Sequence, residues 1–511
     1  MTGMQFTPGR NCWHVATADR MAMIVDGKDY FRTLRGALLK AQRLAMMVGW
    51  DFDFEIEMLP GQSDADGIAP DGFPNRIGEF LNALVEQRPE LDIYLLKWSG
   101  GALIAPGRLL PALHIKLLSP DQIHLAFDGR HPIGACHHQK IVTIDDSLAF
   151  CGGIDVTDGR WDDRDHDSQN PLRRLKNGDI SQPWHDASAM LTGPAAQELA
   201  KLARRRWQRA TEEALDEEFS VDRDLWPDDV RPAFRDIPVA IARTEPPEAE
   251  APLINEIERL YLDSIAAARH HIYIESQYFC SDSITRAIAR RLAEPDGPEI
   301  LVVTPVAAQK QVEDLAMHVT RSRMMRYLQA RDPHRRFRIV SPVTTGGDPI
   351  YVHAKVMVVD DWMLRVGSSN IDRRSMGFDT ECDVAIIGDA AQTRDNIVRF
   401  RNELLAEHMG CPVERVDDAI ARTGSLLGAL DTLNRPTGRG LRPLKPRRET
   451  WLGSFLADTR LFDPRYRKSA QARVGVTSRH LTIGAAVLVA VAGLAWHRHR
   501  RRTPRDRPPR S

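Results

Sequence analysis

The sequence predicts an α/β protein made of two pseudo-symmetric α/β/α halves, each a mixed β-sheet flanked by helices, packed as one unit. Three observations support this prediction. A motif of His, Lys, Asp and small residues occurs twice with the same internal spacing, which indicates an internal duplication. β-branched runs alternate with helical stretches in both halves, as is typical of mixed α/β folds. With 511 residues, the chain can bury one large core or two ordinary domains.

Each half repeats the same order of elements: a helix, a strand, a variable region and then the strand that carries the motif. In the first half a helix over residues 31–44 precedes a strand over 46–54. In the second half a helix over 253–268 precedes a strand over 272–279. The matching order indicates that the duplication extends well beyond the motifs.

Composition marks the segments outside the two halves. The sequence between the halves is acidic and contains several prolines, which indicates an exposed linker, and the C-terminal part is rich in Arg and Pro around a single apolar run. The predicted organisation is a first half at 1–215, an acidic linker at 216–252, a second half at 253–420, a basic Pro- and Arg-rich region at 421–480, a candidate membrane segment at 481–497 and a basic tail at 498–511.

The motif copies are His138-x-Lys140-x4-Asp145-x6-Gly152-Gly153-x-Asp155 and His353-x-Lys355-x4-Asp360-x6-Gly367-Ser368-x-Asn370. Residues i and i+2 of a strand point to the same face, so each histidine is expected beside its lysine. The aspartates Asp145 and Asp360 are interpreted as structural groups that bond backbone donors and hold a hairpin. Small residues after them would let the backbone approach a bound phosphate. The supporting positions are Gly153 and Asp155 in the first copy and Ser368 and Asn370 in the second.

Two histidines with two lysines suit the cleavage of a phosphodiester, whose negative charge repels a nucleophile. Lysines on the phosphoryl oxygens relieve that repulsion in the transition state without a metal ion. One neutral imidazole would attack while the other, as imidazolium, protonates the leaving alcohol, and a pKa of about 6.5 permits both states. The six cysteines form no CxxC pair, so no metal site and no cofactor are expected.

These motifs resemble the HKD motifs of the phospholipase D superfamily, and further segments resemble the catalytic region of eukaryotic-type phospholipase D. Those segments are 153–163, 183–186, 193–196 and 272–279, within a resemblance that spans about residues 20–410. The resemblance implies catalytic roles for His138, Lys140, Asp145, His353, Lys355 and Asp360. It also implies a phosphohistidine intermediate that water or a primary alcohol attacks, with His138 as nucleophile and His353 as general acid and base. The near-symmetry of the motifs leaves that order open.

The resemblance also implies carboxylates that orient the histidines. Glu381 occupies the place of the family carboxylate that orients the second-half histidine. Its first-half counterpart is expected among the acids of 162–167, without a choice between them. For residues 184–186, a structural role in the core is the favoured interpretation.

A net charge of −1 conceals an acidic body and a strongly basic C-terminal region. An acidic body disfavours nucleic-acid binding, and a basic tail suits an anionic bilayer. The apolar run at 481–496 would span about 24 Å as a helix, and flanking arginines could extend it toward the roughly 30 Å hydrocarbon core. Because no signal peptide is evident at the start, we expect membrane association through this segment with the body in the cytoplasm; the alternative is a secreted enzyme.

The expected function is therefore a phospholipase D that hydrolyses glycerophospholipids such as phosphatidylcholine or phosphatidylethanolamine, with possible transphosphatidylation. The expected partners are a phospholipid membrane and water or a primary alcohol as acceptor, and no nucleic acid. The alternatives are a cardiolipin synthase-type phosphatidyltransferase, a superfamily nuclease or other phosphodiesterase, and a non-catalytic membrane tether. The headgroup, the acceptor in the cell and the oligomeric state stay open.

Overall fold

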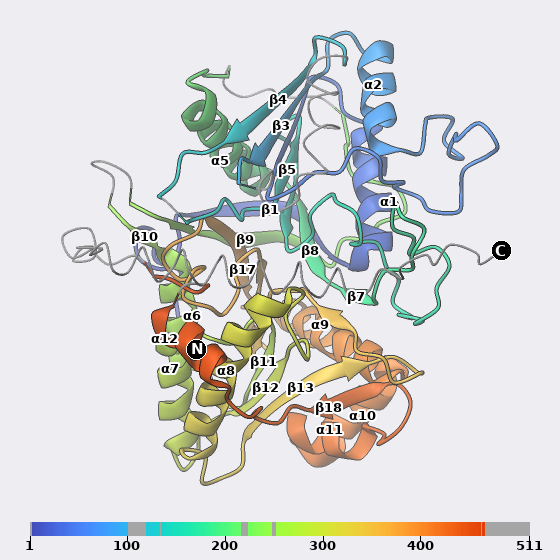
Figure 1. The fold of residues 1–511 in the computed structure, drawn as a ribbon. Coiled ribbons are helices and arrows are strands. Elements are labelled where there is room, and N and C mark those ends of the chain that lie inside the picture. Colours follow the sequence, from blue (N-terminus) through green and yellow to red (C-terminus); the bar gives the residue numbers. More distant parts are fainter. Residues whose placement is uncertain are drawn as a thin grey trace, which may run out of the picture. The chain divides into compact units, whose positions relative to one another are not determined.

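The computed structural model describes residues 3–100, 119–132, 134–215, 223–247, 252–460 and 462–465. Residues Met1–Pro464 form one unit, and Arg465–Ser511 form a second. Within the first unit a single mixed sheet runs in the order β4-β3-β2-β5-β6-β8-β1-β9-β17-β16-β15-β11-β12-β13-β18, with β10 (Ile254–Asn255) paired to β9 (Figure 1).

The two halves of this sheet have the same topology. The first half contributes β1 (His14–Val25), β2 (Leu44–Gly49), β3 (Asp92–Trp98), β4 (Ile123–Asp128), β5 (Ile141–Ile144), β6 (Leu148–Gly152) and β8 (Ala187–Thr192). The second contributes β9 (Phe234–Glu245), β11 (His271–Glu275), β12 (Glu299–Val303), β13 (Phe337–Val343), β15 (Val356–Val359), β16 (Met363–Gly367) and β17 (Glu381–Ile387). In each half two parallel pairings, those of β4-β3-β2 and of β13-β12-β11, give way to antiparallel pairings toward the centre. The predicted fold class is confirmed, and the matching topology supports the predicted duplication.

The halves join through the antiparallel pairing of β1 with β9, in which Val15 lies opposite Ala240. One sheet therefore continues across both halves, a feature that the spacing of the motifs did not predict. A second contact is a short parallel pair, β7 (Trp184–His185) with β14 (Tyr351–Val352), which again joins the first half to the second.

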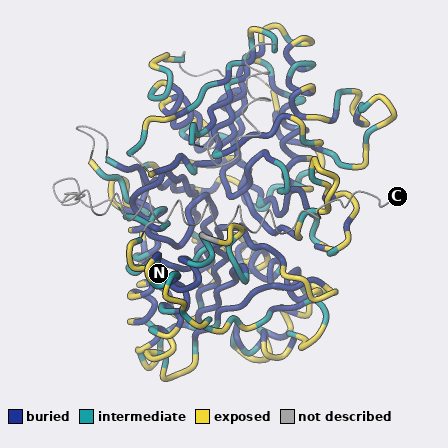
Figure 2. Tube along the Cα trace, in the orientation of Figure 1, coloured by how far each residue is buried: buried dark blue, intermediate teal, exposed yellow. Residues whose placement is uncertain are grey.

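Helices cover both faces of the joined sheet. On one face, α5 (Pro194–Thr211), α9 (Ala391–Met409), α10 (Val413–Thr423) and α11 (Leu426–Leu433) enclose an apolar core that extends through both halves. On the other face the cores are separate. One lies under α1 (Asp26–Leu38) and α2 (Ile77–Gln87), and the other under α6 (Glu256–Ala267), α7 (Asp282–Ala293) and α8 (Gln311–Gln329). Because both faces are covered, the motif strands and their neighbours β8 and β17 are buried along almost their full length, whereas the first part of β1 is exposed (Figure 2).

The prediction of an exposed linker at 216–252 is wrong over Phe234–Glu245. That segment is β9, a central strand in which alternate apolar side chains such as Ile237, Val239 and Ile241 are buried. The acidic composition of 216–252 comes from the sequence on either side of this strand, and it masked the β-branched run within. Residues 216–222 and 248–251 lie outside the described part of the chain.

The boundary predicted for the second half, at 420, is also too early. α11 buries a row of leucines against the core, β18 (Gly440–Pro443) extends the sheet beside β13, and α12 (Trp451–Thr459) packs against α8. Most of the arginines and prolines of this region lie between these elements, which is why composition alone suggested a separate region. The apolar run at 481–496 lies outside the described residues. Among the described residues no helix is long and apolar enough to cross a membrane.

Both motif hairpins are held by their aspartates. Asp145 and Asp360 have positive φ values of 46° and 48°, a conformation that Asp tolerates better than most residues. The Asp145 carboxylate accepts hydrogen bonds from the backbone N–H groups of residues 42–44, all at 2.8 Å. Asp360 accepts the equivalent bonds from residues 269–271 at 2.8 to 2.9 Å. These bonds to backbone donors are the ones predicted, and they fix each motif strand against the strand beside it.

Candidate active site

The two motif histidines lie where the backbone of one half is hydrogen-bonded to the backbone of the other. The N–H of His138 donates to the carbonyl of Thr380 at 3.0 Å, and the N–H of His353 donates to the carbonyl of His185 at 2.7 Å. Each histidine comes just before its motif strand, so the strand directs it toward the junction between the halves. The duplication thus brings two distant segments of the sequence together around one pseudo-twofold axis.

Each histidine is held by a carboxylate from the opposite half. Nδ1 of His138 lies 2.9 Å from Oε2 of Glu381, and Nδ1 of His353 lies 2.6 Å from Oδ2 of Asp186. Among the described residues neither Nε2 atom has a hydrogen bond, so both second ring nitrogens are available to a substrate. A carboxylate on Nδ1 fixes the ring orientation and places a proton on that nitrogen, which leaves the lone pair on Nε2.

This arrangement corrects two predictions. Glu381 contacts the first-half histidine and not the second-half one, and the counterpart carboxylate is Asp186, outside the range 162–167. The two acids occupy equivalent positions in the two halves, and each contacts the histidine of the other half. Asp186 stands two residues before Ser188, which pairs with Gly152, and Glu381 stands two residues before Asp383, which pairs with Gly367. The structural interpretation of residues 184–186 is therefore wrong for Asp186.

The motif glycines make room for these neighbours. A Cβ on Gly153 would lie 2.1 Å from the Asp186 carboxylate, and a Cβ on Gly152 would lie 2.4 Å from the Cα of Ser188. A Cβ on Gly367 would come within 2.5 Å of the Cα of Asp383. The prediction that these glycines serve to approach a phosphate is therefore replaced by a packing reason, since any side chain here would displace the carboxylates or the next strand.

The lysines and the supporting residues surround the histidines unequally. Each lysine donates to the carbonyl of its own motif histidine. Nζ of Lys140 also lies 3.1 Å from Oδ2 of Asp155, whereas the second motif has Asn370 at the equivalent position. Ser368, the remaining supporting residue, donates to Glu381 at 2.5 Å. The first motif thus carries an ion pair that the second lacks.

A cavity of about 610 Å³ connects these groups. It is lined by both motif histidines, by Asp155 and Asn370, and by the side chains of Trp50 and Arg160. Both histidines, one further polar residue from each motif and an arginine therefore face a single space of a size that could hold the polar part of a ligand.

Comparisons with known proteins agree with this geometry. A family model described as "Phospholipase D" matches residues 128–295, and one described as "Cardiolipin synthase, PLD-like domain" matches residues 261–402. Phospholipase D1 of Saccharomyces cerevisiae is 22% identical over 515 residues, covering 79% of this chain and 29% of that protein. Phospholipase D alpha 4 of Arabidopsis thaliana is 24% identical over 417 residues, covering 62% of this chain and 53% of that protein.

The chain belongs to the phospholipase D superfamily. It spans about half or less of the length of these curated relatives. Among solved structures, phosphatidylserine synthase from Haemophilus influenzae aligns with a TM-score of 0.49 and 13% identity, over 82% of this chain and 96% of that chain.

Burial sets the protonation of the superfamily's histidine pair in this chain. Burial, together with the nearby lysines, holds the pKa of both His138 and His353 well below the ordinary value. Both imidazoles are therefore neutral near pH 7 in the free protein, as a nucleophile requires. A bound phosphodiester anion would favour the protonated form of one of them, which is the form that a general acid needs.

Burial also shifts the pKa values of Glu381 and Lys355 in this site. Burial raises the pKa of Glu381 to about 8, against the hydrogen bonds from Ser368 and Ser375. Burial also lowers the pKa of Lys355 to about 7, although Asp186 opposes the shift. Lys355 therefore loses much of its charge above neutral pH unless an anion is present.

The sequence did not assign a catalytic role to four residues of this superfamily site: Asp186, Arg160, Ser375 and Gln277. All but Ser375 lie in segments that resemble phospholipase D, but nothing in those segments singled them out. The Arg160 guanidinium lies 4.0 Å above the ring of Trp184, which in turn stacks on Tyr351. Gln277 bonds the Tyr351 hydroxyl. Aligning β8 with β17, the strand that follows each hairpin in the sheet, would have placed Asp186 opposite Glu381; the others depend on contacts between segments far apart in the sequence.

Proposed function

We propose that the chain is a phospholipase D that hydrolyses the headgroup phosphodiester of glycerophospholipids to phosphatidic acid and a free alcohol. The observation that supports the proposal most is the pair of histidines in one cavity, each held at Nδ1 by a carboxylate from the opposite half. This arrangement supplies two equivalent Nε2 atoms for opposite tasks, together with cations to neutralise a phosphoryl group.

In the proposed first step, Nε2 of His138 attacks phosphorus and the bond from phosphorus to the headgroup oxygen breaks. The proton on Nε2 of His353 passes to that oxygen, so the free alcohol leaves and a phosphatidyl-histidine remains. Lys140 and Lys355 stabilise the negative charge of the phosphoryl oxygens as the transition state forms. The assignment of His138 as the nucleophile rests on the superfamily resemblance.

In the second step, His353 removes a proton from water as the water oxygen attacks phosphorus. The bond to His138 breaks, phosphatidic acid leaves, and both histidines return to their starting states. A primary alcohol in place of water gives an exchanged phospholipid by the same route. Hydrolysis and transfer therefore compete for one intermediate.

The cavity wall suits a cationic headgroup. Trp50 and Trp98 both line the cavity with ring centroids 5.7 Å apart, and Glu313 adds a carboxylate on the lining. A quaternary ammonium is attracted to the faces of tryptophan rings. This supports choline, or ethanolamine, as the headgroup.

A lipid substrate also requires a surface that meets the bilayer, and we assign this role to α12. Trp451 is 82% exposed and Phe455 37%, and their rings stack at 6.1 Å. Exposed Lys445 and Arg448 precede them, which suits anionic lipid headgroups. Phe462, just beyond the helix, lines the active-site cavity. The apolar run at 481–496 remains proposed as a second attachment, with the body in the cytoplasm.

The test is an assay of the purified full chain with a panel of labelled phospholipids, with and without ethanol, followed by chromatography of the products. We expect phosphatidic acid from phosphatidylcholine or phosphatidylethanolamine, and phosphatidylethanol when ethanol is present. Folded protein that cleaves no glycerophospholipid would contradict the proposal, and cleavage of nucleic acid alone would favour a nuclease.

A second candidate is a cardiolipin synthase-type phosphatidyltransferase, which the family model matching residues 261–402 favours. In that reaction the acceptor is the alcohol of a second phosphatidylglycerol. Phosphatidylglycerol vesicles in the same assay separate the two, because the synthase would yield cardiolipin and free glycerol where the hydrolase would yield phosphatidic acid.

A further inference from the structure

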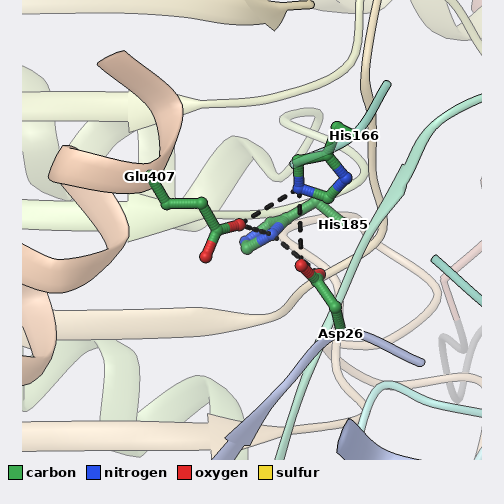
Figure 3. Close-up of side chains that lie close together, drawn as sticks. All are labelled: Asp26, His166, His185 and Glu407. Atoms are coloured by element: carbon green, nitrogen blue, oxygen red, sulfur yellow. Dashed lines mark hydrogen bonds and ion pairs between the residues drawn. The ribbon is translucent and has the colours of Figure 1, made fainter. Parts of the chain in front are cut away.

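A buried cluster of histidines and carboxylates lies outside the residues of the proposed reaction. It consists of Asp26 at the start of α1, His166 in the loop after β6, His185 in β7 and Glu407 near the end of α9 (Figure 3). All four side chains are at least nine-tenths buried. Figure 3 shows that they converge on one point from four separate segments, three from the first half and one from the second.

We propose that this cluster is a structural site for one divalent transition-metal ion, with zinc as the best match. The donor set is two imidazole nitrogens and two carboxylate oxygens, which suits zinc and similar ions. Magnesium and calcium prefer all-oxygen sites, so they fit less well. Four protein ligands would close the coordination sphere, as is usual for a structural zinc site.

The distances between the donor atoms match such a sphere. Oε1 of Glu407 lies 3.1 Å from Nε2 of His166 and 3.0 Å from Nδ1 of His185. Asp26 places Oδ2 at 3.4 Å from the first nitrogen and Oδ1 at 3.1 Å from the second. In a tetrahedral zinc site with bonds of about 2.0 to 2.1 Å, neighbouring donor atoms lie about 3.3 Å apart. The cluster therefore needs little movement to accept an ion.

Two atoms of the cluster lack the hydrogen bonds that buried polar groups normally make. Among the described residues, Oδ2 of Asp26 and Nδ1 of His185 have no hydrogen-bond partner, although each lies within ion-pair distance of others in the cluster. Both belong to the inward-facing donor set. A metal ion at the centre would satisfy both atoms, whereas an uncompensated buried polar atom is destabilising.

The outward-facing atoms are bonded as they are around bound metals. Nδ1 of His166 lies 2.8 Å from the Asp162 carboxylate, and Nε2 of His185 lies 3.0 Å from that of Glu275. A carboxylate on the far nitrogen of a metal-binding histidine fixes its tautomer and leaves the other nitrogen unprotonated for the metal. Here both histidines have that support, and Arg164 bonds the second oxygen of Glu407.

The charge of the cluster matches that of one dication. With both histidines neutral, the cluster and its supporting residues carry four carboxylates and two arginines, which are Asp26, Asp162, Glu275, Glu407, Arg164 and Arg173. The remaining two negative charges match one divalent ion. Two protons, one on each histidine, would supply the same charge, so protons are the competing occupant.

The proposed metal site is connected to the catalytic histidine His353 through one residue, Asp186. His185 precedes Asp186, and Oδ1 of Asp26 accepts the N–H of Asp186 at 3.1 Å. Asp186 in turn contacts His353. An ion that fixes Asp26 and His185 would therefore help to position the Asp186 carboxylate without touching the substrate. Its role is structural and independent of whether the proposed lipid reaction is the correct one.

The test measures metal content and not activity. The full chain is stripped with a chelator, incubated with zinc, freed of excess metal by gel filtration and examined by elemental analysis and X-ray absorption. We expect one zinc per chain, with about two imidazole nitrogens and two oxygens at 2.0 to 2.1 Å. Fewer than about 0.2 zinc per chain, or a coordination shell without histidine, would overturn the proposal. Neither measurement depends on a variant that has to fold.

Variants locate the ion. H166Q should lose at least four-fifths of the bound zinc and the rise in Tm that zinc gives the wild type. H124A is the matched control, because His124 is a part-exposed histidine with its own carboxylate, Asp92, at 3.0 Å; it should bind zinc as the wild type does. Equal zinc content in H166Q and H124A would show that the metal binds elsewhere and would refute the assignment.

Discussion

Replacing Asp186 with Asn isolates the contribution of one carboxylate to the proposed catalysis. The change keeps the side-chain volume but removes the charge that faces Nδ1 of His353 at 2.6 Å in a fully buried position. A charge-assisted hydrogen bond contributes about 1.5 to 3 kcal/mol, so its loss alone should reduce turnover about 10- to 100-fold. An amide N–H that donates to Nδ1 would also move the ring proton to Nε2, the wrong tautomer, and bring the loss toward about 10⁴-fold.

The assay follows kcat and KM on detergent-dispersed phosphatidylcholine, with the Tm of each variant as a check of folding. Glu381 faces Nδ1 of His138 in the same way, so E381Q should also lower turnover; because burial raises the pKa of Glu381 to about 8, the loss near pH 7 should be smaller than that of D186N. D92N is the control, since Asp92 makes a comparable contact with a histidine but on a part-exposed surface; it should change kcat less than twofold. If folded D186N kept more than half of the wild-type kcat, the argument that this carboxylate orients His353 would be refuted.

Three further predictions test the site and its surface. H138A and H353A should each lower turnover on the order of 10³-fold or more with unchanged Tm, and either one retaining a tenth of wild-type activity would contradict the two-histidine mechanism. Since burial lowers the pKa of Lys355 to about 7 and a bound anion favours its charged form, affinity for a singly charged phosphonate monoester analogue should be full below pH 7. It should fall about tenfold per pH unit above that, until the pKa of the complex is reached, whereas a flat titration-calorimetry profile between pH 6 and 9 would exclude the coupling. Replacing Trp451 and Phe455 by Ser should weaken binding to anionic vesicles about tenfold or more in sedimentation and leave activity on detergent-dispersed lipid unchanged; equal sedimentation would show that α12 does not meet the bilayer.

The sequence predicted most of the features that depend on short segments and that occur in both halves. The duplicated motifs gave the fold class, and the spacing from each lysine to its aspartate gave the bonds of Asp145 and Asp360 to the backbone. The helix and strand before each motif were also found, at α1 with β2 and at α6 with β11, a few residues from their predicted bounds.

What the sequence did not predict depends on contacts across the pseudo-twofold axis. Asp186 was missed because its partner, His353, lies 167 positions away. β9 was missed because its strand pairings with β1 and β17 bury a segment whose flanks are charged. The four members of the buried cluster come from positions 26, 166, 185 and 407, so no local spacing could indicate a metal site.

Each half supplies the carboxylate that orients the histidine of the other half. This arrangement bears on how the chain arose and on what happens when it is cut in two. A protein with a single copy of the motif would have a histidine without its orienting acid until two molecules associated about a twofold axis. The duplicated chain makes that association permanent, and β1 paired with β9 occupies the place where two such subunits would meet. Cutting the chain between α5 and β9 should therefore give two fragments that are each inactive and that recover activity only when they reassemble.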